Sequence, residues 1–364
     1  MGKRGRHIIR PKRKRRIITS VIVAVVLPVL LVGGIALKLA GNVKTIDVDT
    51  TAASEPDGPL NILIIGSDSR AAGEGKYGED DGSGRSDSMV LAHLSEDDSR
   101  VDAVQIPRDL TTEVPACEDD GFAGGLSMIN ATFEYGPGCA VKAVQEVTGV
   151  PVHHFVVLDF DGFAGMVDAI GGIEMCLEEP VLDELSMVDL DAGRHERDGE
   201  QSLALARTRH AFGDGSDIAR LEHQQLVMSS IAQKATSQGV LTRPDRLVRL
   251  LDAVTKSLTV DDELGSVGDM TGLARRLARV PLSGITFQVM PWQPASFDQN
   301  RVEMTDEART LFAALRDDVP PGQEQAAEET TEPADPAAPA QPEQPGSSTG
   351  PSAGATTADT SICG

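Results

Sequence analysis

The chain has 364 residues, enough for one large domain or two medium ones with a sizeable core, and 24% of them are charged. Its net charge of −23 is uneven, because the first 16 residues carry nine Lys or Arg and no acid, which leaves 24 basic against 56 acidic residues beyond them. That acidic body disfavours nucleic acid as a partner and restricts anion binding to local basic clusters.

An uncharged stretch of 21 residues, Ile17 to Leu37, follows the basic arm. It is long enough to cross a bilayer, and the excess of Lys and Arg before it places the N-terminus in the cytoplasm. A cleaved signal peptide is the alternative, but the apolar run exceeds a usual signal core and no small-residue cleavage site follows it. We therefore expect a single-pass protein of the cell membrane. Its parts are a cytoplasmic arm (1–16), a transmembrane helix (17–40), a polar stalk (41–59) and an extracytoplasmic domain (60–319).

The periodicity of residues 60–319 alternates between strand and helix. In chain order it predicts strands 60–68, 87–95 and 99–109, helix 139–149, strand 153–160, helix 161–172, strand 173–180, and helices 198–206 and 217–239. Strands that alternate with helices imply a three-layer αβα sandwich with a central mixed sheet, largely parallel and covered on both faces. From residue 320 to 364 the chain has eight prolines and no Lys or Arg, which predicts a disordered tail.

Four cysteines fit a location outside the membrane, where disulfides persist. Cys117 and Cys139 bracket a short loop and are the expected pair. Cys176 and Cys363 remain, and their spacing does not decide whether they pair.

Asp and Arg recur together near the ends of the first three predicted strands. The pairs are Asp68 with Arg70, Arg85 with Asp87, and Arg108 with Asp109. Carboxylates offer hard oxygens to Mg²⁺, and arginines neutralise phosphate charge, which is the combination that phosphoryl transfer needs. One such pair is more often a salt bridge, but three at strand ends predict an active site.

A second arginine cluster lies between residues 204 and 225. If the chain is extended after helix 198–206, Arg207 and Arg209 share one face. Asp217 is then the N-cap of the long helix, and Arg220 and Gln224 lie one turn apart. Helix N-termini attract anions, and forked guanidinium groups match phosphate oxygens. A surface set of ion pairs is the alternative, and these residues alone do not decide between the two.

The order of motifs along residues 60–235 resembles that of the LytR-CpsA-Psr family of cell-envelope phosphotransferases. The matching segments are NILIIGSDSR, RSDSMVL, IPRDL, INATFEYG, FDGFAGMVDAIGGIE, DGEQSLALARTRH and DIARLEHQQ. The resemblance implies a membrane-anchored, Mg²⁺-dependent enzyme. Such an enzyme moves a glycopolymer from a polyprenyl-pyrophosphate carrier to peptidoglycan through a phosphodiester bond.

The resemblance also implies roles for individual residues. Asp68 and Asp87 are expected on the metal side, and Asp109, beside Arg108, is expected to activate the acceptor hydroxyl. The expected pyrophosphate ligands are Arg85, Arg108, Arg207, Arg209 and Arg220, supported by Asp217 and Gln224. His223 departs from the pattern, because relatives often have a second basic residue there.

The lipid of the donor needs an apolar site. Candidates are segment 161–172 and one stripe of the long helix, formed by Ile218, Leu221, Leu226, Met228 and Ile231, although core packing is the default for such stripes. A non-catalytic membrane regulator that senses lipid pyrophosphates is a different reading, which the short basic arm disfavours because it is too small for an output domain. A polyprenyl-pyrophosphate pyrophosphatase is a third. Arg276, expected on a helix surface, is a candidate neutral control.

Overall fold

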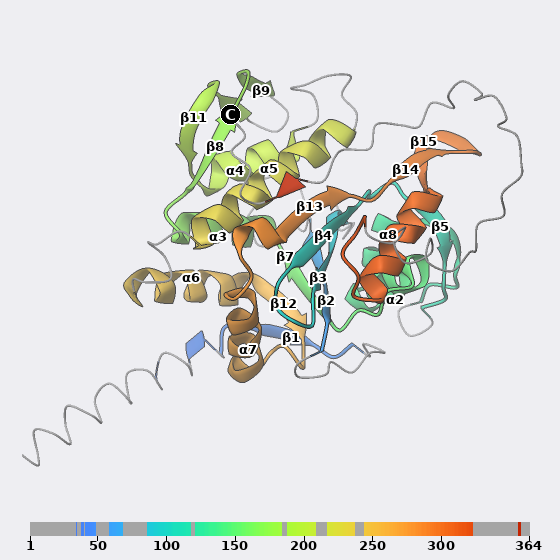
Figure 1. The fold of residues 1–364 in the computed structure, drawn as a ribbon, viewed down its shortest axis with the longest axis horizontal. Coiled ribbons are helices and arrows are strands. Elements are labelled where there is room, and N and C mark those ends of the chain that lie inside the picture. Colours follow the sequence, from blue (N-terminus) through green and yellow to red (C-terminus); the bar gives the residue numbers. More distant parts are fainter. Residues whose placement is uncertain are drawn as a thin grey trace, which may run out of the picture.

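The computed structural model describes residues 34, 38–39, 41–48, 58–67, 86–117, 121–183, 188–208, 217–236, 244–322 and 356–357. Their helices and strands form three layers, with one large sheet in the middle (Figure 1). Most of the expected transmembrane segment, 17–40, lies outside these residues. Within the described part of the chain, no helix combines the length and apolar character needed to cross a membrane.

The middle layer is a mixed sheet of eight strands in the order β1-β12-β7-β2-β3-β4-β13-β16. In that order the strands are Lys44–Ile46, Leu258–Asp261, His154–Leu158, Leu60–Ser67, Ser86–Leu94, Val101–Ile106, Ile285–Val289 and Thr356–Thr357. The expected mixed sheet is confirmed, but only three of its seven pairings are parallel. The parallel share was overestimated because β3 and β4 are joined by the short turn 95–100, which only antiparallel neighbours allow.

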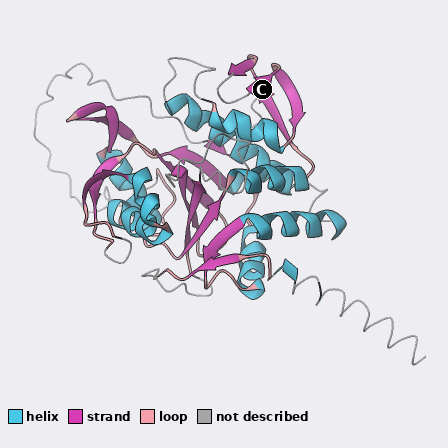
Figure 2. Ribbon diagram, turned by 180° about the vertical axis from the view of Figure 1, so that it is seen from behind, coloured by secondary structure: helices cyan, strands magenta, loops and turns pink. Residues whose placement is uncertain are grey.

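Helices cover both faces of the sheet, as Figure 2 shows from behind. On one face, α2 (Pro137–Thr148), α8 (Asp306–Arg316) and the 3-10 helix η2 (Ile129–Tyr135) enclose the largest core, which includes Leu63, Val104 and Phe155. The other face carries α3 (Phe160–Ala169), α5 (Asp217–Thr236), α6 (Pro244–Ser257) and α7 (Val267–Leu277). A shorter helix, α4 (Gly199–Arg207), packs against α3 and α5.

Four small antiparallel pairs surround the central sheet. They are β5 (Thr111–Val114) with β6 (Gly125–Met128), β8 (Ile173–Leu177) with β11 (Gly193–Arg197), β9 (Val181–Asp183) with β10 (Val188–Leu190), and β14 (Trp292–Ala295) with β15 (Asp298–Met304). The 3-10 turn η3 (Leu282–Gly284) precedes β13. The predicted strand 173–180 therefore exists as β8, but it lies outside the main sheet.

Two short strands lie outside the segment 60–319 that was expected to fold. β1 lies in the predicted stalk and pairs in parallel with β12, and β16 lies in the predicted disordered tail and pairs with β13. Both add to edges of the sheet, where unpaired backbone groups accept a neighbour. Segments of two or three residues carry no period of their own, so local pattern does not predict these two strands.

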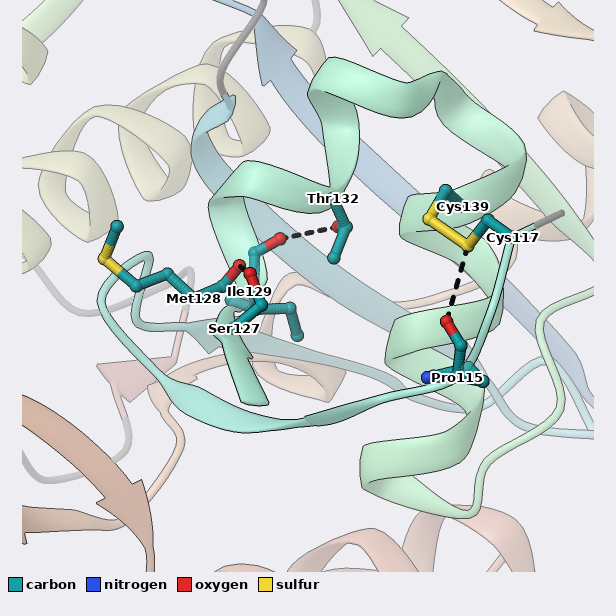
Figure 3. Close-up of a disulfide and its surroundings, with 7 residues drawn as sticks. All are labelled: Pro115, Cys117, Ser127, Met128, Ile129, Thr132 and Cys139. Atoms are coloured by element: carbon teal, nitrogen blue, oxygen red, sulfur yellow. Dashed lines mark hydrogen bonds between the residues drawn. A yellow bond between two sulfur atoms is a disulfide. The ribbon is translucent and has the colours of Figure 1, made fainter. Parts of the chain in front are cut away.

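The expected disulfide between Cys117 and Cys139 is present, with the two Cα atoms 5.5 Å apart (Figure 3). It joins the segment after β5 to the first turn of α2, and both cysteines are fully buried. Cys176 is also disulfide-bonded, whereas Cys363 lies outside the described residues.

Removing this disulfide is expected to destabilise the domain by about 3 kcal/mol, because the unfolded chain regains the freedom of a loop of that length. The comparison is urea denaturation of the oxidised wild type and of the Cys117→Ala/Cys139→Ala variant. Equal free energies of unfolding would show that the bridge does not stabilise the fold.

Buried histidines make the stability of the domain dependent on pH. Burial lowers the pKa of His93, His153 and His223 from the ordinary 6.5, although for His93 the carboxylate of Asp318, 3.0 Å from Nε2, opposes the shift. Below pH 6.5 the unfolded chain therefore binds protons that the folded protein does not. The free energy of unfolding therefore has its full value above pH 6.5 and falls as the pH drops below 6.5.

We expect urea denaturation to give a clearly lower free energy of unfolding at pH 5.5 than at pH 7.5. Each histidine kept neutral contributes up to about 1.4 kcal/mol per pH unit. His153→Gln should make the dependence shallower. The buried aspartates whose pKa is lowered act only below their ordinary value of 3.8, so they do not contribute in this window. Equal stability at both pH values would contradict the prediction.

Candidate active site

The start of β3 and the end of β4 bring the first predicted residues together. The strands are antiparallel, with Met89 opposite Ile106, so Asp87 lies near the turn that follows β4. Nη1 of Arg108 donates a hydrogen bond of 3.1 Å to Oδ1 of Asp87. Both side chains are about one quarter exposed or less, which leaves them within reach of a ligand. This edge of the sheet therefore holds the expected combination of a carboxylate and a guanidinium group.

Asp109 occupies the same turn, which is closed by a hydrogen bond from Leu110 N to Pro107 O. Its Oδ2 lies 3.7 Å from Nε of Arg108, and its Oδ1 lies 3.5 Å from Nη1 of Arg301. Arg301 belongs to β15 and was not predicted. It carries no motif and is far from Asp109 in sequence, so no local signal pointed to it.

Arg207 is the last residue of α4, and its guanidinium carbon lies 4.6 Å from the ring centre of Phe160. The extended backbone begins only at Thr208, whose hydroxyl donates to Asp183 at 2.6 Å. The expectation that Arg207 is itself part of an extended segment is therefore wrong, because the helix continues for one more residue. Phe160, the first residue of α3, was not predicted. It presents an aromatic face to the cation, an arrangement that favours a fixed guanidinium plane.

Gln224 connects α5 to the rest of the site. Its Oε1 accepts a hydrogen bond from Nε2 of Gln105 on β4, and its Nε2 donates to the carbonyl oxygen of Ala206 at 3.2 Å. Gln105 is 1% exposed and three residues before Arg108. Through this pair the end of β4 contacts α5, and α5 contacts the end of α4. Gln105 was also missed, since a lone glutamine inside an apolar strand shows no pattern.

Several predicted site residues belong to other parts of the chain than those described above. Asp68, Arg70, Arg85 and Arg209 lie outside the described residues. α5 begins at Asp217, which is therefore its first helical residue rather than the expected N-cap. The helix also contains Arg220, but the side chains of these two residues are not described.

The apolar residues on one stripe of α5 contact two different parts of the domain. Met228 contacts the sheet cluster of Val90, Ala103 and Phe287, whereas Leu226 and Ile231 pack into a separate core beneath β8 and β10. Both of these residues are partly buried and pack against that core, as the default reading of such a stripe expects. The opposite case is Ile64 of the central strand β2, which is 37% exposed although β3 and β7 flank the strand. The helical layer therefore leaves this apolar point of the sheet uncovered.

Arg276 is not a neutral surface residue. Its Nε donates to Oδ1 of Asp98 at 2.6 Å, and its side chain is only 12% exposed, because α7 packs against the turn between β3 and β4. Arg309 of α8 is the better control, with a side chain 60% exposed and one ion pair to the exposed Asp306.

A model of the LytR_cpsA_psr family matches residues 35–316. The chain is 33% identical over 307 residues to the probable cell wall biosynthesis protein LcpB of Corynebacterium glutamicum, covering 81% of this chain and 70% of that protein. It is 28% identical over 236 residues to the polyisoprenyl-teichoic acid–peptidoglycan teichoic acid transferase TagT of Bacillus subtilis, covering 63% of this chain and 69% of TagT.

A solved structure, the LytR-Csp2A-Psr enzyme from Actinomyces oris, superposes with a TM-score of 0.61 and 26% identity. The match covers 76% of this chain and 96% of that one. The chain spans from 51% to 70% of the length of the first three curated relatives that it matches.

Proposed function

Because the chain belongs to the LytR_cpsA_psr family, we propose that it transfers a glycopolymer from a polyprenyl-pyrophosphate carrier to peptidoglycan. The product bond is a phosphodiester, formed during cell-wall assembly. The observation that carries the proposal is the set of guanidinium and carboxylate groups around the end of β4, where Arg108 contacts Asp87 and Gln224 joins α5 to the end of α4. The name of TagT, a teichoic acid–peptidoglycan transferase, supports the same donor and acceptor classes.

In the proposed reaction, an acceptor hydroxyl oxygen attacks the phosphorus atom that carries the glycan. The bond from that phosphorus to the bridging oxygen breaks, polyprenyl phosphate leaves, and the hydroxyl proton is released. Arg108 and Arg207 neutralise the pyrophosphate, because a forked guanidinium donates to two phosphate oxygens at once. Asp87 keeps Arg108 in place by accepting its hydrogen bond. Gln105 keeps the end of α4 in place indirectly, by its hydrogen bond to Gln224. The prenyl chain of the donor needs an apolar surface, and the uncovered point of β2 at Ile64 is a candidate for its contact.

Mg²⁺ is part of the proposal. Asp87 offers carboxylate oxygens beside Arg108, and one or two carboxylates together with substrate phosphates are a usual magnesium set. Among the described residues, no group of three or more His, Cys, Asp or Glu is placed to hold a metal, and the second expected carboxylate, Asp68, lies outside them. When held by Asp87 and Asp68, the ion would neutralise charge on the phosphate oxygens.

The test uses the full chain extracted in detergent. Mass spectrometry of the lipids that co-purify should find a polyprenyl pyrophosphate that carries a glycan, and this donor should label peptidoglycan in a reconstituted reaction. Hydrolysis of the donor without transfer would identify a pyrophosphatase instead. Binding without any turnover would favour a sensor of lipid pyrophosphates.

We also propose that residues 41–364 lie outside the cell membrane, held by the segment 17–40. The nine basic residues before that segment and the disulfide of Cys117 support this orientation. Protease added to intact cells should digest the domain. Digestion only after lysis would reverse the assignment.

A further inference from the structure

Asp109 lies between two guanidinium groups that come from distant parts of the chain. Its Oδ2 faces Nε of Arg108 at 3.7 Å, and its Oδ1 faces Nη1 of Arg301 at 3.5 Å. The side chain of Asp109 is 20% exposed and that of Arg301 is 36% exposed. The carboxylate of Asp109 and the guanidinium group of Arg301 are therefore both partly shielded from water. Ion pairs in such a place are screened less than on an open surface.

The backbone fixes this arrangement. Val302 N donates to the carbonyl oxygen of Asp109 at 3.3 Å, and Leu110 forms a parallel bridge with Val302. The hairpin β14–β15 thus lies directly against the turn that carries Arg108 and Asp109, as its position beside β5 in Figure 1 also shows. Within the hairpin, Nε of Arg301 lies 3.9 Å from Oδ2 of Asp298.

We infer that Arg301 is a positioning residue for pyrophosphate binding, and that Asp109 is a bridging carboxylate rather than the base for the acceptor hydroxyl. The inference rests on the proposed function. Arg301 neutralises part of the negative charge of Asp109, so Asp109 attracts Arg108 less strongly. The guanidinium group of Arg108 can then bind the pyrophosphate of the donor. Without Arg301, Asp109 would compete more strongly with the pyrophosphate for Arg108.

The same geometry argues against Asp109 as a base. Each of its two oxygens faces a guanidinium group, so a hydroxyl that approached either oxygen would have to share that oxygen with an arginine. A general base must hold its substrate proton at hydrogen-bond distance. Both oxygens of Asp109 already interact with a cation, which disfavours a role in accepting that proton.

The experiment measures binding of geranylgeranyl pyrophosphate to the full chain in detergent, by titration calorimetry at fixed ionic strength. The variants are Arg301→Ala, Asp109→Asn, the double variant and Arg309→Ala as the matched control. Arg301→Ala should weaken binding by about twofold to fivefold, the range for a partly exposed ion pair. Asp109→Asn should not weaken binding, because it removes the competing charge. In the Asp109→Asn background, Arg301→Ala should have no further effect.

An equal loss from Arg301→Ala in both backgrounds would mean that Arg301 contacts the ligand directly, and no loss in either would mean that the hairpin is not coupled to the site. Either result overturns the inference. Failure of the wild type to bind the probe would instead count against the proposed function. Melting temperatures of all variants check folding, and Arg301→Lys should bind nearly as well as the wild type.

Turnover separates the two roles of Asp109. If Asp109 is a bridging carboxylate, the substitution Asp109→Asn should change kcat by less than tenfold. A loss of about 10² to 10⁴, the contribution of a general base, would restore the catalytic role.

Discussion

Arg207→Ala is expected to reduce glycopolymer transfer by about 30-fold to several-thousand-fold. Arg207 ends α4 with its guanidinium group over Phe160, and we propose that this group contacts the pyrophosphate. Its removal leaves a phosphate charge without compensation, which costs about 2–5 kcal/mol. The measurement is the initial rate of transfer from a polyprenyl-pyrophosphate donor to peptidoglycan.

The structure changes the expected effect of this substitution on stability. A cation in the last turn of a helix is stabilised by the helix dipole, and contact with an aromatic face adds to this. Arg207→Ala should therefore lower the free energy of unfolding by about 1 kcal/mol, far less than its effect on transfer. Arg207→Lys should recover the stability but only part of the activity, since lysine keeps the charge and loses the fork.

Two further variants complete this test. Arg309→Ala should change neither transfer nor stability, because the side chain of Arg309 is exposed and has no role in the proposed site. Phe160→Leu should weaken transfer less than Arg207→Ala, and Phe160→Tyr should retain it, because tyrosine keeps the aromatic face. Full transfer by the Arg207→Ala/Arg209→Ala double variant would mean that these arginines are a surface ion-pair set.

Gly199→Ala is expected to cost about 3 kcal/mol or more of stability and to abolish soluble expression or activity as a consequence. Gly199 is the first residue of α4, and its N–H donates to Oδ1 of Asp168 at 2.8 Å. A Cβ atom at this position would overlap the backbone carbonyl of Ala164, with the carbonyl carbon only 2.6 Å away. Overpacking against backbone is costly because no side chain can rotate aside. The substitution would force α3 and α4 apart, and these helices carry Phe160 and Arg207.

Gly165 supplies the matched control, since it lies inside α3 and a Cβ atom there would meet nothing within 4 Å. Gly165→Ala should stabilise the domain by about 0.5–1 kcal/mol, the ordinary helix preference for alanine. Urea denaturation of both variants gives the comparison. Similar stabilities would show that α3 and α4 tolerate separation, and would remove the steric reason for glycine at 199.

Most of the elements that carry motifs were predictable from local pattern. The first three strands, the helices after residues 137, 160, 199 and 217, and the disulfide lie close to the predicted positions. Short-range physical chemistry accounts for this success, because helix and strand periods, caps and glycine stops act within a few residues. In α4, for example, Asp198 and Gln201 form a capping box that the sequence carries in four consecutive residues. Arg108 and Asp87, both predicted site residues, are in contact, although the sequence paired Arg108 with Asp109 and Asp87 with Arg85.

The partners of those residues depend instead on the order of strands in space. Arg301 reaches Asp109 because β15 lies beside the turn after β4, and Gln105 reaches Gln224 because α5 covers that end of the sheet. Neither partner has a local period or motif. The edge strand β1 is similar, since it exists only through its hydrogen bonds to β12, more than 200 residues later. Local pattern thus indicates which residue types stand at the ends of strands, whereas packing between distant segments sets which of them touch. That difference arises because side-chain contacts depend on distances of a few ångströms that the whole sheet establishes together.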